Sequence, residues 1–235
     1  MIVLVDQRID NTSLLTLKKT GAECFLVPPS SFIQVGVASH PDMLFFVGFG
    51  KIFCHKKYLE ANRSLVESIV DASRLELALS DEEIGKKYPH DVKFNAAMVG
   101  NNLICNKKTV SKLILTSAAQ NGCRIIDVPQ GYTKCSTCVV SDNAVITADK
   151  PIFDACLAHN IDALLISEGN IDLPGYDYGF IGGASGCYGK SIYFCGDITR
   201  HPDEKEIIDF CQKHGKTAIS LSNQRLFDVG TLMFI

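Results

Sequence analysis

The sequence lacks any apolar stretch long enough to cross a bilayer, and it lacks any long run of like charge. A membrane-spanning helix needs about 20 apolar residues, whereas the first apolar stretch of this chain ends after four residues, at Asp6. The 23 basic and 26 acidic residues are interspersed, which argues against a nucleic-acid-binding surface. No basic leader precedes the first apolar residues. We therefore expect a cytoplasmic protein that binds a small molecule or another protein, and neither membranes nor nucleic acid.

Motifs for metals and cofactors are also scarce. Cys135 and Cys138 form a single Cys-x-x-Cys pair, and no second pair stands at the spacing of a zinc site. The glycine-rich segment 179–190 matches neither a P-loop nor a dinucleotide-binding fingerprint. We therefore expect no metal and no organic cofactor. The ten cysteines are expected to be reduced thiols, most of them small core residues.

An internal repeat organises the chain. Related segments begin at Val47 (VGFGKIFCHKK), Val99 (VGNNLICNKK), Val139 (VVSDNAVITADKP) and Gly189 (GKSIYFCGDITRHP). Each reads as two strands and is followed by an amphipathic helical stretch and then a short β-type run, so the apolar period changes from two to about 3.6 and back. The repeating unit is therefore strand, strand, helix, strand.

The two ends of the sequence complete one another. The N-terminal part predicts strand, helix and strand (IVLV, NTSLLTLKKTG and AECFLVP), and the C-terminal DVGTLMFI supplies the missing first strand. The predicted blades are 226–235 with 1–30, 38–80, 88–130, 132–168 and 176–223. A ring closed in this way leaves no unpaired sheet edge at the ends. We predict a single domain over residues 1–235, an α/β five-bladed β/α-propeller.

Two motifs stand at the starts of blades. In QGYTKCSTCVV, Gly131 precedes Cys135 by four residues, and Ser136 and Thr137 follow it. His40-Pro41-Asp42 opens the second blade. The architecture and both motifs resemble the pentein fold of the guanidino-group-modifying enzymes, a family of deiminases, dimethylarginine hydrolases and amidinotransferases that also includes a non-catalytic ribosome anti-association factor. The cysteine of that family normally lies near the C-terminus, where this chain has Phe227 to Thr231 and no cysteine.

The resemblance implies a site and a reaction. Cys135 would attack a guanidino or amidino carbon to form a covalent thiouronium intermediate, and His40, assisted by Asp42, would move protons. Glu168 in ISEGN is similar to a glutamate turn of the family and would bind the substrate. The implied activity is that of a cysteine-dependent hydrolase or transferase.

Further residues are candidates for substrate binding. His90-Asp91 occupies the station of His40 in the third blade, as a channel-lining pair or as the preferred turn of the repeat. The segment 179–190, which contains Gly182, Gly183 and Cys187, suits a ligand-binding loop or a flexible link, since glycine permits close backbone approach.

Other interpretations stay open at the level of the sequence. Cys135 is also interpretable as a buried strand residue, which would fit a non-catalytic, ring-shaped binding or scaffold protein. A redox role of Cys135, Cys138 and Cys187 is a third possibility. A thiolate at Cys135 with a lowered pKa would favour the enzyme, because a binding protein has no need of one.

Overall fold

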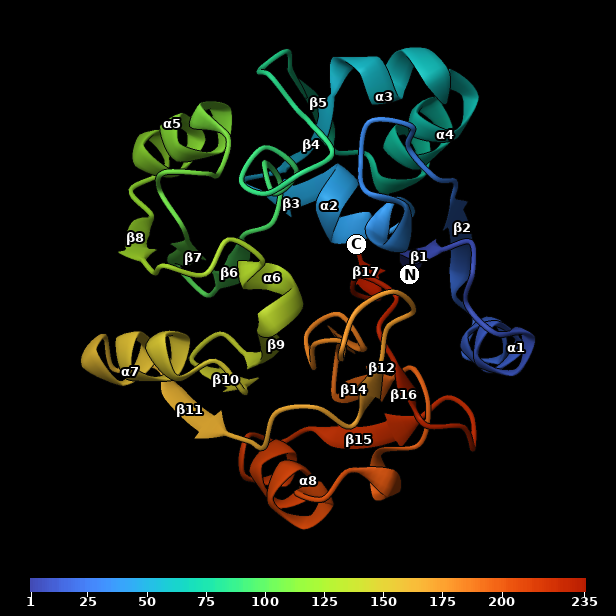
Figure 1. The fold of residues 1–235 in the computed structure, drawn as a ribbon, viewed down its shortest axis with the longest axis vertical. Helices are drawn as coiled ribbons and strands as arrows, with labels where there is room; N and C mark the ends of the chain where they lie inside the picture. Colours follow the sequence, from blue (N-terminus) through green and yellow to red (C-terminus); the bar gives the residue numbers. More distant parts are fainter.

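The computed structural model describes residues 1–235 and places five three-stranded sheets around a central axis (Figure 1). The five blades consist of β17 (Met233–Phe234), β1 (Ile2–Asp6) and β2 (Glu23–Val27); β3 (Phe45–Gly48), β4 (Lys51–His55) and β5 (Glu76–Ser80); β6 (Ala97–Val99), β7 (Asn102–Cys105) and β8 (Arg124–Asp127); β9 (Cys138–Ser141), β10 (Ala144–Thr147) and β11 (Asp162–Leu165); and β13 (Ser185–Tyr188), β14 (Ser191–Phe194) and β15 (Thr217–Ser220). The predicted five-bladed β/α-propeller is confirmed.

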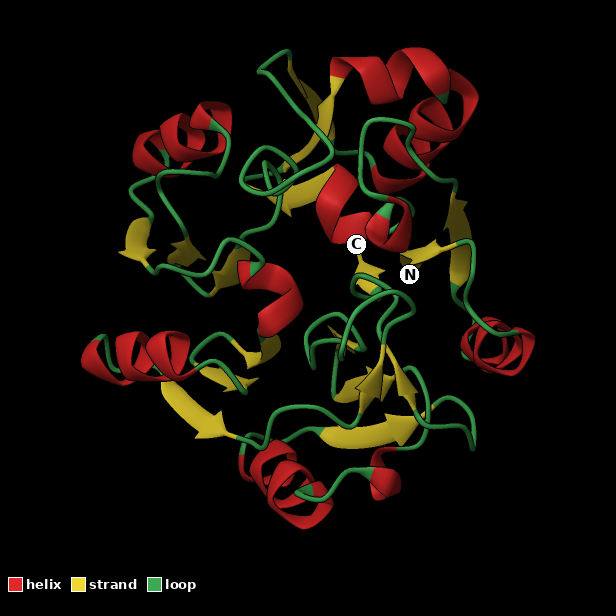
Figure 2. Ribbon diagram, in the orientation of Figure 1, coloured by secondary structure: helices red, strands yellow, loops and turns green.

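The order of elements within a blade also agrees with the repeat. The first two strands pair antiparallel and the second and third pair parallel, and a parallel pair requires a crossover connection. Helices provide it: α1 (Asn11–Lys19), α3 (Lys56–Ala61) with α4 (Arg63–Ser73), α5 (Lys112–Gln120), α7 (Lys150–Ala158) and α8 (Glu204–Lys213). Figure 2 shows these helices on the rim and the strands inside them.

Local sequence explains the hairpins and the helix starts. The loop between β3 and β4 has two residues, Phe49 and Gly50, with φ of 57° and 72°, which is the backbone of a tight hairpin turn whose twist matches the strands. Asp149 is the N-cap residue of α7, and its side chain accepts a hydrogen bond from the Ile152 amide. The turns and caps of the repeat are therefore local products of the sequence.

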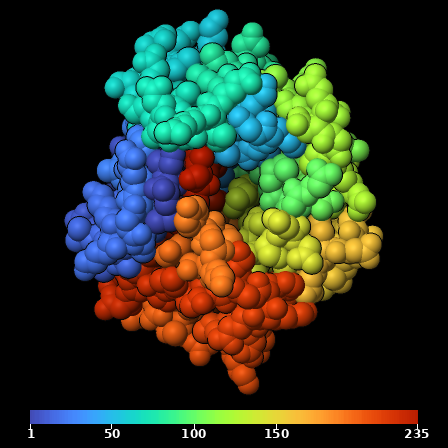
Figure 3. All heavy atoms as spheres, turned by 180° about the vertical axis from the view of Figure 1, so that it is seen from behind, coloured from blue at the N-terminus to red at the C-terminus, as the bar shows by residue number.

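The chain ends meet in one blade, as predicted. Val3 of β1 pairs with Phe234 of β17 in antiparallel register, and Ile2 and Ile235 exchange two backbone hydrogen bonds of 3.3 and 3.0 Å. Figure 3 shows the opposite face of the molecule, where the C-terminal segment (red) lies near the middle beside the N-terminal segment (dark blue).

The structure departs from the repeat at the starts of the blades. A short helix, α2 (Pro41–Leu44), precedes β3, and α6 (Thr133–Ser136) precedes β9. Cys135 therefore lies in a helical turn, and the interpretation of Cys135 as a strand residue is wrong. An additional two-stranded sheet joins β12 (Ile171–Asp172) to β16 (Leu226–Phe227).

The remaining elements are two short 3-10 helices, η1 (Val35–Val37) and η2 (Ile198–Arg200). The largest apolar cluster has 28 buried residues and runs through the first three blades, whereas polar side chains meet on the axis. None of the helices is both long enough and apolar enough to span a bilayer.

Candidate functional site

A cavity of about 230 Å³ opens among the loops at the blade starts. We call it the loop-side cavity. Its ionisable lining residues, apart from three tyrosines, are His40, Cys135, Asp177 and Asp228, and no lysine or arginine lines it. The structure thus brings together the predicted nucleophile and the predicted proton carrier, which lie in different blades.

The thiol of Cys135 is held by two polar neighbours. Its Sγ donates to Asp42 Oδ2 at 3.0 Å and accepts from Asn95 Nδ2 at 3.1 Å. Burial raises the pKa of Cys135 well above its ordinary value, and the negative charges of Asp42 and Asp228 raise it further. The resting group is therefore a thiol, not a thiolate.

Asp42 lies beneath this thiol with no solvent exposure. Its Oδ2 accepts from Thr231 Oγ1 at 2.8 Å as well as from Cys135, while its Oδ1 has no hydrogen-bond partner. Burial raises the pKa of Asp42, and the nearby Lys134 opposes that shift. A buried carboxyl group in this setting can accept or hold a proton.

His40 is a neutral imidazole between two carboxyl groups. Its Nε2 and Nδ1 lie 3.8 Å from Asp6 Oδ2 and from Asp228 Oδ1, and neither nitrogen has a hydrogen-bond partner. Burial, and then the charge of Arg8, lower the pKa of His40 to about 3. The ring fits because residue 230 is glycine, since a Cβ atom at that position would lie 2.1 Å from His40 Cβ.

Asp228 faces His40 from the C-terminal segment. Its two carboxylate oxygens accept from the amides of Phe180 and Gly230, each at 2.9 Å. Burial, and then the charge of Asp42, raise the pKa of Asp228 to about 7. Asp228 can therefore exchange a proton near neutral pH.

Asn95 contacts Cys135 and links three blades. Its Oδ1 accepts from the amides of Lys134 (2.6 Å) and Cys135 (3.2 Å), at the start of α6. Its Nδ2 lies 3.2 Å from the backbone oxygen of Asp42. These contacts fix the position of the thiol relative to α2.

The remaining predicted residues lie at various distances from the thiol. His90 is exposed, whereas Asp91 is buried and accepts from the hydroxyl of Tyr132 at 2.8 Å, so Asp91 positions a lining residue. Glu168 is exposed and lies in a separate cavity. It accepts from the hydroxyl of Tyr178 at 3.3 Å.

The glycine-rich segment packs against the site. Gly183 donates its amide to the Cys135 carbonyl at 2.8 Å, and Gly182 lies against the backbone of α6. Cys187 lines a different cavity, on the strand side of the axis. All ten cysteines are free thiols.

Comparison with known proteins assigns the chain to a family. A sequence-family model described as a family of unknown function, DUF6873, matches residues 4–233. The chain belongs to the DUF6873 family. A search of curated proteins finds no match.

Solved structures share the fold of this DUF6873 chain. DDAH from Pseudomonas aeruginosa, a cysteine-to-serine variant in complex with citrulline, matches with a TM-score of 0.58 at 10% identity, over 94% of this chain and 91% of that chain. SxtG, an amidinotransferase from Microseira wollei, matches with a TM-score of 0.55 at 11% identity, over 95% and 80%. Agmatine deiminase from C. jejuni matches with a TM-score of 0.51 at 8% identity, over 94% and 76%. The DUF6873 chain therefore has the pentein fold.

Sequence reasoning missed several residues of the site. Asn95, Asp228 and Thr231 are absent from the predicted site, although all three are buried at blade starts. An alignment of the blades would have placed Asp228 and Thr231 at the station of His40-Pro41-Asp42, just before a first strand. Asn95, in KFNAAM, belongs to no recognisable motif.

Three side chains of the DUF6873 site could hold a metal ion. The ligand atoms of His40, Asp42 and Cys135 lie within 4.8 Å of one another. One nitrogen, one oxygen and one sulfur are a donor set that suits a zinc-like ion. The expectation of a metal-free site stays a prediction.

Proposed function

We propose that this DUF6873 protein is a cysteine-dependent hydrolase or transferase that acts on a guanidino or amidino compound. One observation carries the proposal: the loop-side cavity places a thiol next to a set of groups that suits a planar cation. Asp177 and Asp228 supply negative charge, and no lysine or arginine lines the wall. Bidentate contacts to carboxylates favour a guanidinium or amidinium group.

Aromatic rings complete this cation site. The cavity is also lined by Tyr132, Tyr176, Tyr178 and Phe180. The rings of Tyr132 and Phe180 stack with centroids 6.4 Å apart, and ring faces attract cations. The names of the similar structures, which include a dimethylarginine dimethylaminohydrolase, an amidinotransferase and an agmatine deiminase, support this substrate class.

The proposed reaction begins at the thiol. A bound cation next to Cys135 lowers the thiol pKa, which compensates for the increase caused by burial. The sulfur forms a bond to the guanidino carbon while its proton passes to Asp42 Oδ2, 3.0 Å away. One C–N bond then breaks, and the released nitrogen receives that proton through His40.

The second half of the reaction releases the thiol. Water, or an acceptor amine in a transferase, adds to the carbon of the thiouronium intermediate and loses a proton. The carbon–sulfur bond then breaks, and that proton passes to the sulfur, which restores the Cys135 thiol. Asp228, which lies 3.8 Å from His40 and has a pKa of about 7, can take up the proton lost by the attacking group. His40 and Asp228 together thus serve as the proton relay.

A non-catalytic, cation-binding function is the alternative. The pKa of Cys135 is raised in the resting protein. Near the C-terminus, where the pentein enzymes carry their cysteine, this chain has Asp228 to Thr231 and no cysteine. Both observations favour a protein that binds a guanidino compound without attacking it.

Labelling with 2-chloroacetamidine, with neutral chloroacetamide as the matched reagent, tests the proposal. We expect the amidine to add once, at Cys135, and faster than the amide, because a cation is held beside the thiol. Half-buried Cys24 serves as the internal reference for non-specific reaction. Asp228→Asn should remove the preference for the amidine.

Turnover is then tested by screening guanidino compounds for released urea or ammonia. Equal, scattered labelling by the two reagents, or full turnover by Cys135→Ala, would rule out thiol catalysis. Selective labelling without any turnover would favour the binding protein.

A further inference from the structure

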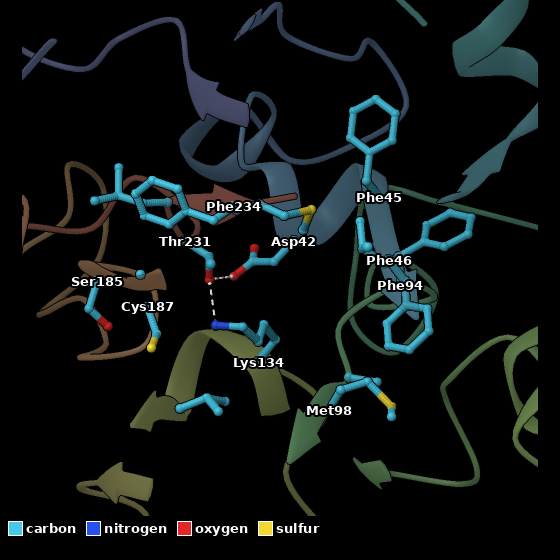
Figure 4. A pocket seen from close by; sticks show the side chains of 16 residues that line it. Asp42, Phe45, Phe46, Phe94, Met98, Lys134, Ser185, Cys187, Thr231 and Phe234 are labelled. Atoms are coloured by element: carbon cyan, nitrogen blue, oxygen red, sulfur yellow. Dashed lines mark hydrogen bonds between the residues drawn. The ribbon is translucent and has the colours of Figure 1, made fainter. Parts of the chain in front are cut away.

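A second cavity lies on the same axis, behind the thiol. Its volume is about 210 Å³, and the first strand of every blade contributes to its wall. Figure 4 shows this strand-side cavity, whose wall includes Phe46, Met98, Val139, Cys187 and Phe234, one from each blade. Most of the wall is apolar, in contrast to the polar groups at its inner end.

The inner end carries an ammonium group without an ionic partner. Lys134 Nζ donates to Thr231 Oγ1 at 3.1 Å and, more weakly, lies 3.5 Å from the Thr137 carbonyl oxygen. No carboxylate lies within ion-pair distance of it. Figure 4 shows Lys134 extending toward Thr231 and Asp42. A cation at the end of an apolar cavity attracts an anion with little competition from water.

We propose that the strand-side cavity binds a small organic carboxylate with an aromatic or aliphatic body. The carboxylate accepts a hydrogen bond from Lys134 Nζ, and the apolar body packs against Phe46, Met98 and Phe234. An apolar cavity of about 150 Å³ holds benzene, so the larger volume here accommodates an acid of the size of benzoate.

Other classes of ligand fit the cavity less well. A guanidino or amino compound would meet the charge of Lys134 at the inner end. Phosphate and other strongly hydrated anions would lose their water against an apolar wall without compensation. The carboxylate site is therefore distinct in charge preference from the loop-side cavity, and its existence does not depend on catalysis.

A tryptophan reporter tests the binding directly. The chain has no tryptophan, so Phe234→Trp places a single fluorescent indole in the wall, and Phe153→Trp on α7 is the remote control. We expect benzoate to change the fluorescence of the Phe234→Trp variant with saturation, and benzamide and inorganic phosphate to leave it unchanged. Lys134→Met in this background should weaken benzoate binding at least about tenfold, and exposed Lys190→Met should not.

Ligand-detected NMR measures benzoate binding to the parent protein, so the result does not depend on correct folding of the tryptophan variant. Cys135→Ser should still bind benzoate, so that loss of thiol chemistry is distinguishable from loss of this site. Three results would overturn the proposal: no saturable benzoate signal, equal binding of benzamide, or unchanged affinity in Lys134→Met.

Discussion

A single carboxyl group, that of Asp42, determines the state of the Cys135 thiol. It is the acceptor of the thiol proton at 3.0 Å, and its charge is the second-largest cause, after burial, of the raised thiol pKa. The same side chain is shared with Thr231. Small changes at position 42 are therefore expected to have larger effects on the thiol than changes elsewhere in the cavity.

Asp42→Asn is predicted to lower the pKa of Cys135, because the substitution removes a neighbouring negative charge. Alkylation of Cys135 by iodoacetamide should then be faster than in the parent protein at a given mildly alkaline pH. Peptide mapping across a pH series measures it. Asp177→Asn is the matched control, since Asp177 lines the cavity without being among the causes of the thiol shift. Identical pH profiles of Asp42→Asn and the parent would contradict this account.

Asp228 should make stability depend on pH. Its pKa rises from 3.8 in the unfolded chain to about 7 in the folded protein, so the folded state holds a proton that the unfolded state releases. The protein therefore loses stability as the pH rises between these two values. When the pH rises from about 5 to about 8, the free energy of unfolding of the parent should fall by about 3 kcal/mol more than that of Asp228→Asn.

Urea unfolding at the two pH values measures this difference. Exposed Asp209→Asn controls for removal of a surface charge and should behave as the parent does. Parallel pH dependence in the parent and in Asp228→Asn would mean that Asp228 titrates normally.

At the scale of elements, the short helix α6 depends on the segment that follows β12. Gly182 packs so closely on α6 that a Cβ atom would lie 2.3 Å from the Lys134 carbonyl oxygen and 2.4 Å from that of Thr137. The amide of Gly183 adds a hydrogen bond to the Cys135 carbonyl. This segment therefore supports the thiol from behind.

Gly182→Ala is expected to destabilise the protein by about 3 kcal/mol, because backbone atoms on both sides must move. It should also impair selective labelling of Cys135 by shifting α6. Gly85→Ala is the comparison, since its Cβ would meet only His90 Cβ, at 3.3 Å. Chemical unfolding and amidine labelling of both variants provide the test, and equal stability of the two would refute the packing argument.

The elements of the fold could be predicted because each arises from local sequence. The pair Phe49-Gly50 forms its hairpin, and Asp149 caps its helix, through contacts within a few residues. The site could be predicted only in part. Thr231 meets Asp42 across 189 positions, and no periodicity indicates which of many buried polar residues converge at such separations. His40 and Cys135 were found because they belong to motifs, whereas Asn95 does not.

At the scale of the whole molecule, the site exists because the ring is closed. Thr231, Asp42, Asn95 and Cys135 come from four successive blades and are joined by hydrogen bonds. The fifth blade joins through the Gly182 carbonyl, 3.0 Å from Thr231 Oγ1. This polar layer separates the loop-side cavity from the strand-side cavity. Displacement of any blade would therefore disturb both cavities together.

The first blade lacks the hairpin that joins the first two strands of each of the other blades. β17 and β1 pair antiparallel, as β3 and β4 do, and Ile2 and Ile235 already exchange two backbone hydrogen bonds. A two-residue Asn-Gly turn in place of Met1 would join them as Phe49-Gly50 joins β3 and β4.

A circular permutant with this turn, opened between exposed Lys86 and Lys87, should fold. Its unfolding temperature should lie within a few degrees of that of the parent, which corresponds to a difference of roughly 1 kcal/mol in the free energy of unfolding. Thermal unfolding followed by circular dichroism, with amidine labelling of Cys135, measures both the fold and the site.

A matched permutant opened between Thr133 and Lys134 cuts α6, so it should lose the selective labelling even where it folds. If the first permutant lost stability or labelling to the same extent, closure of the ring by β17 and β1 would not be what holds the site together.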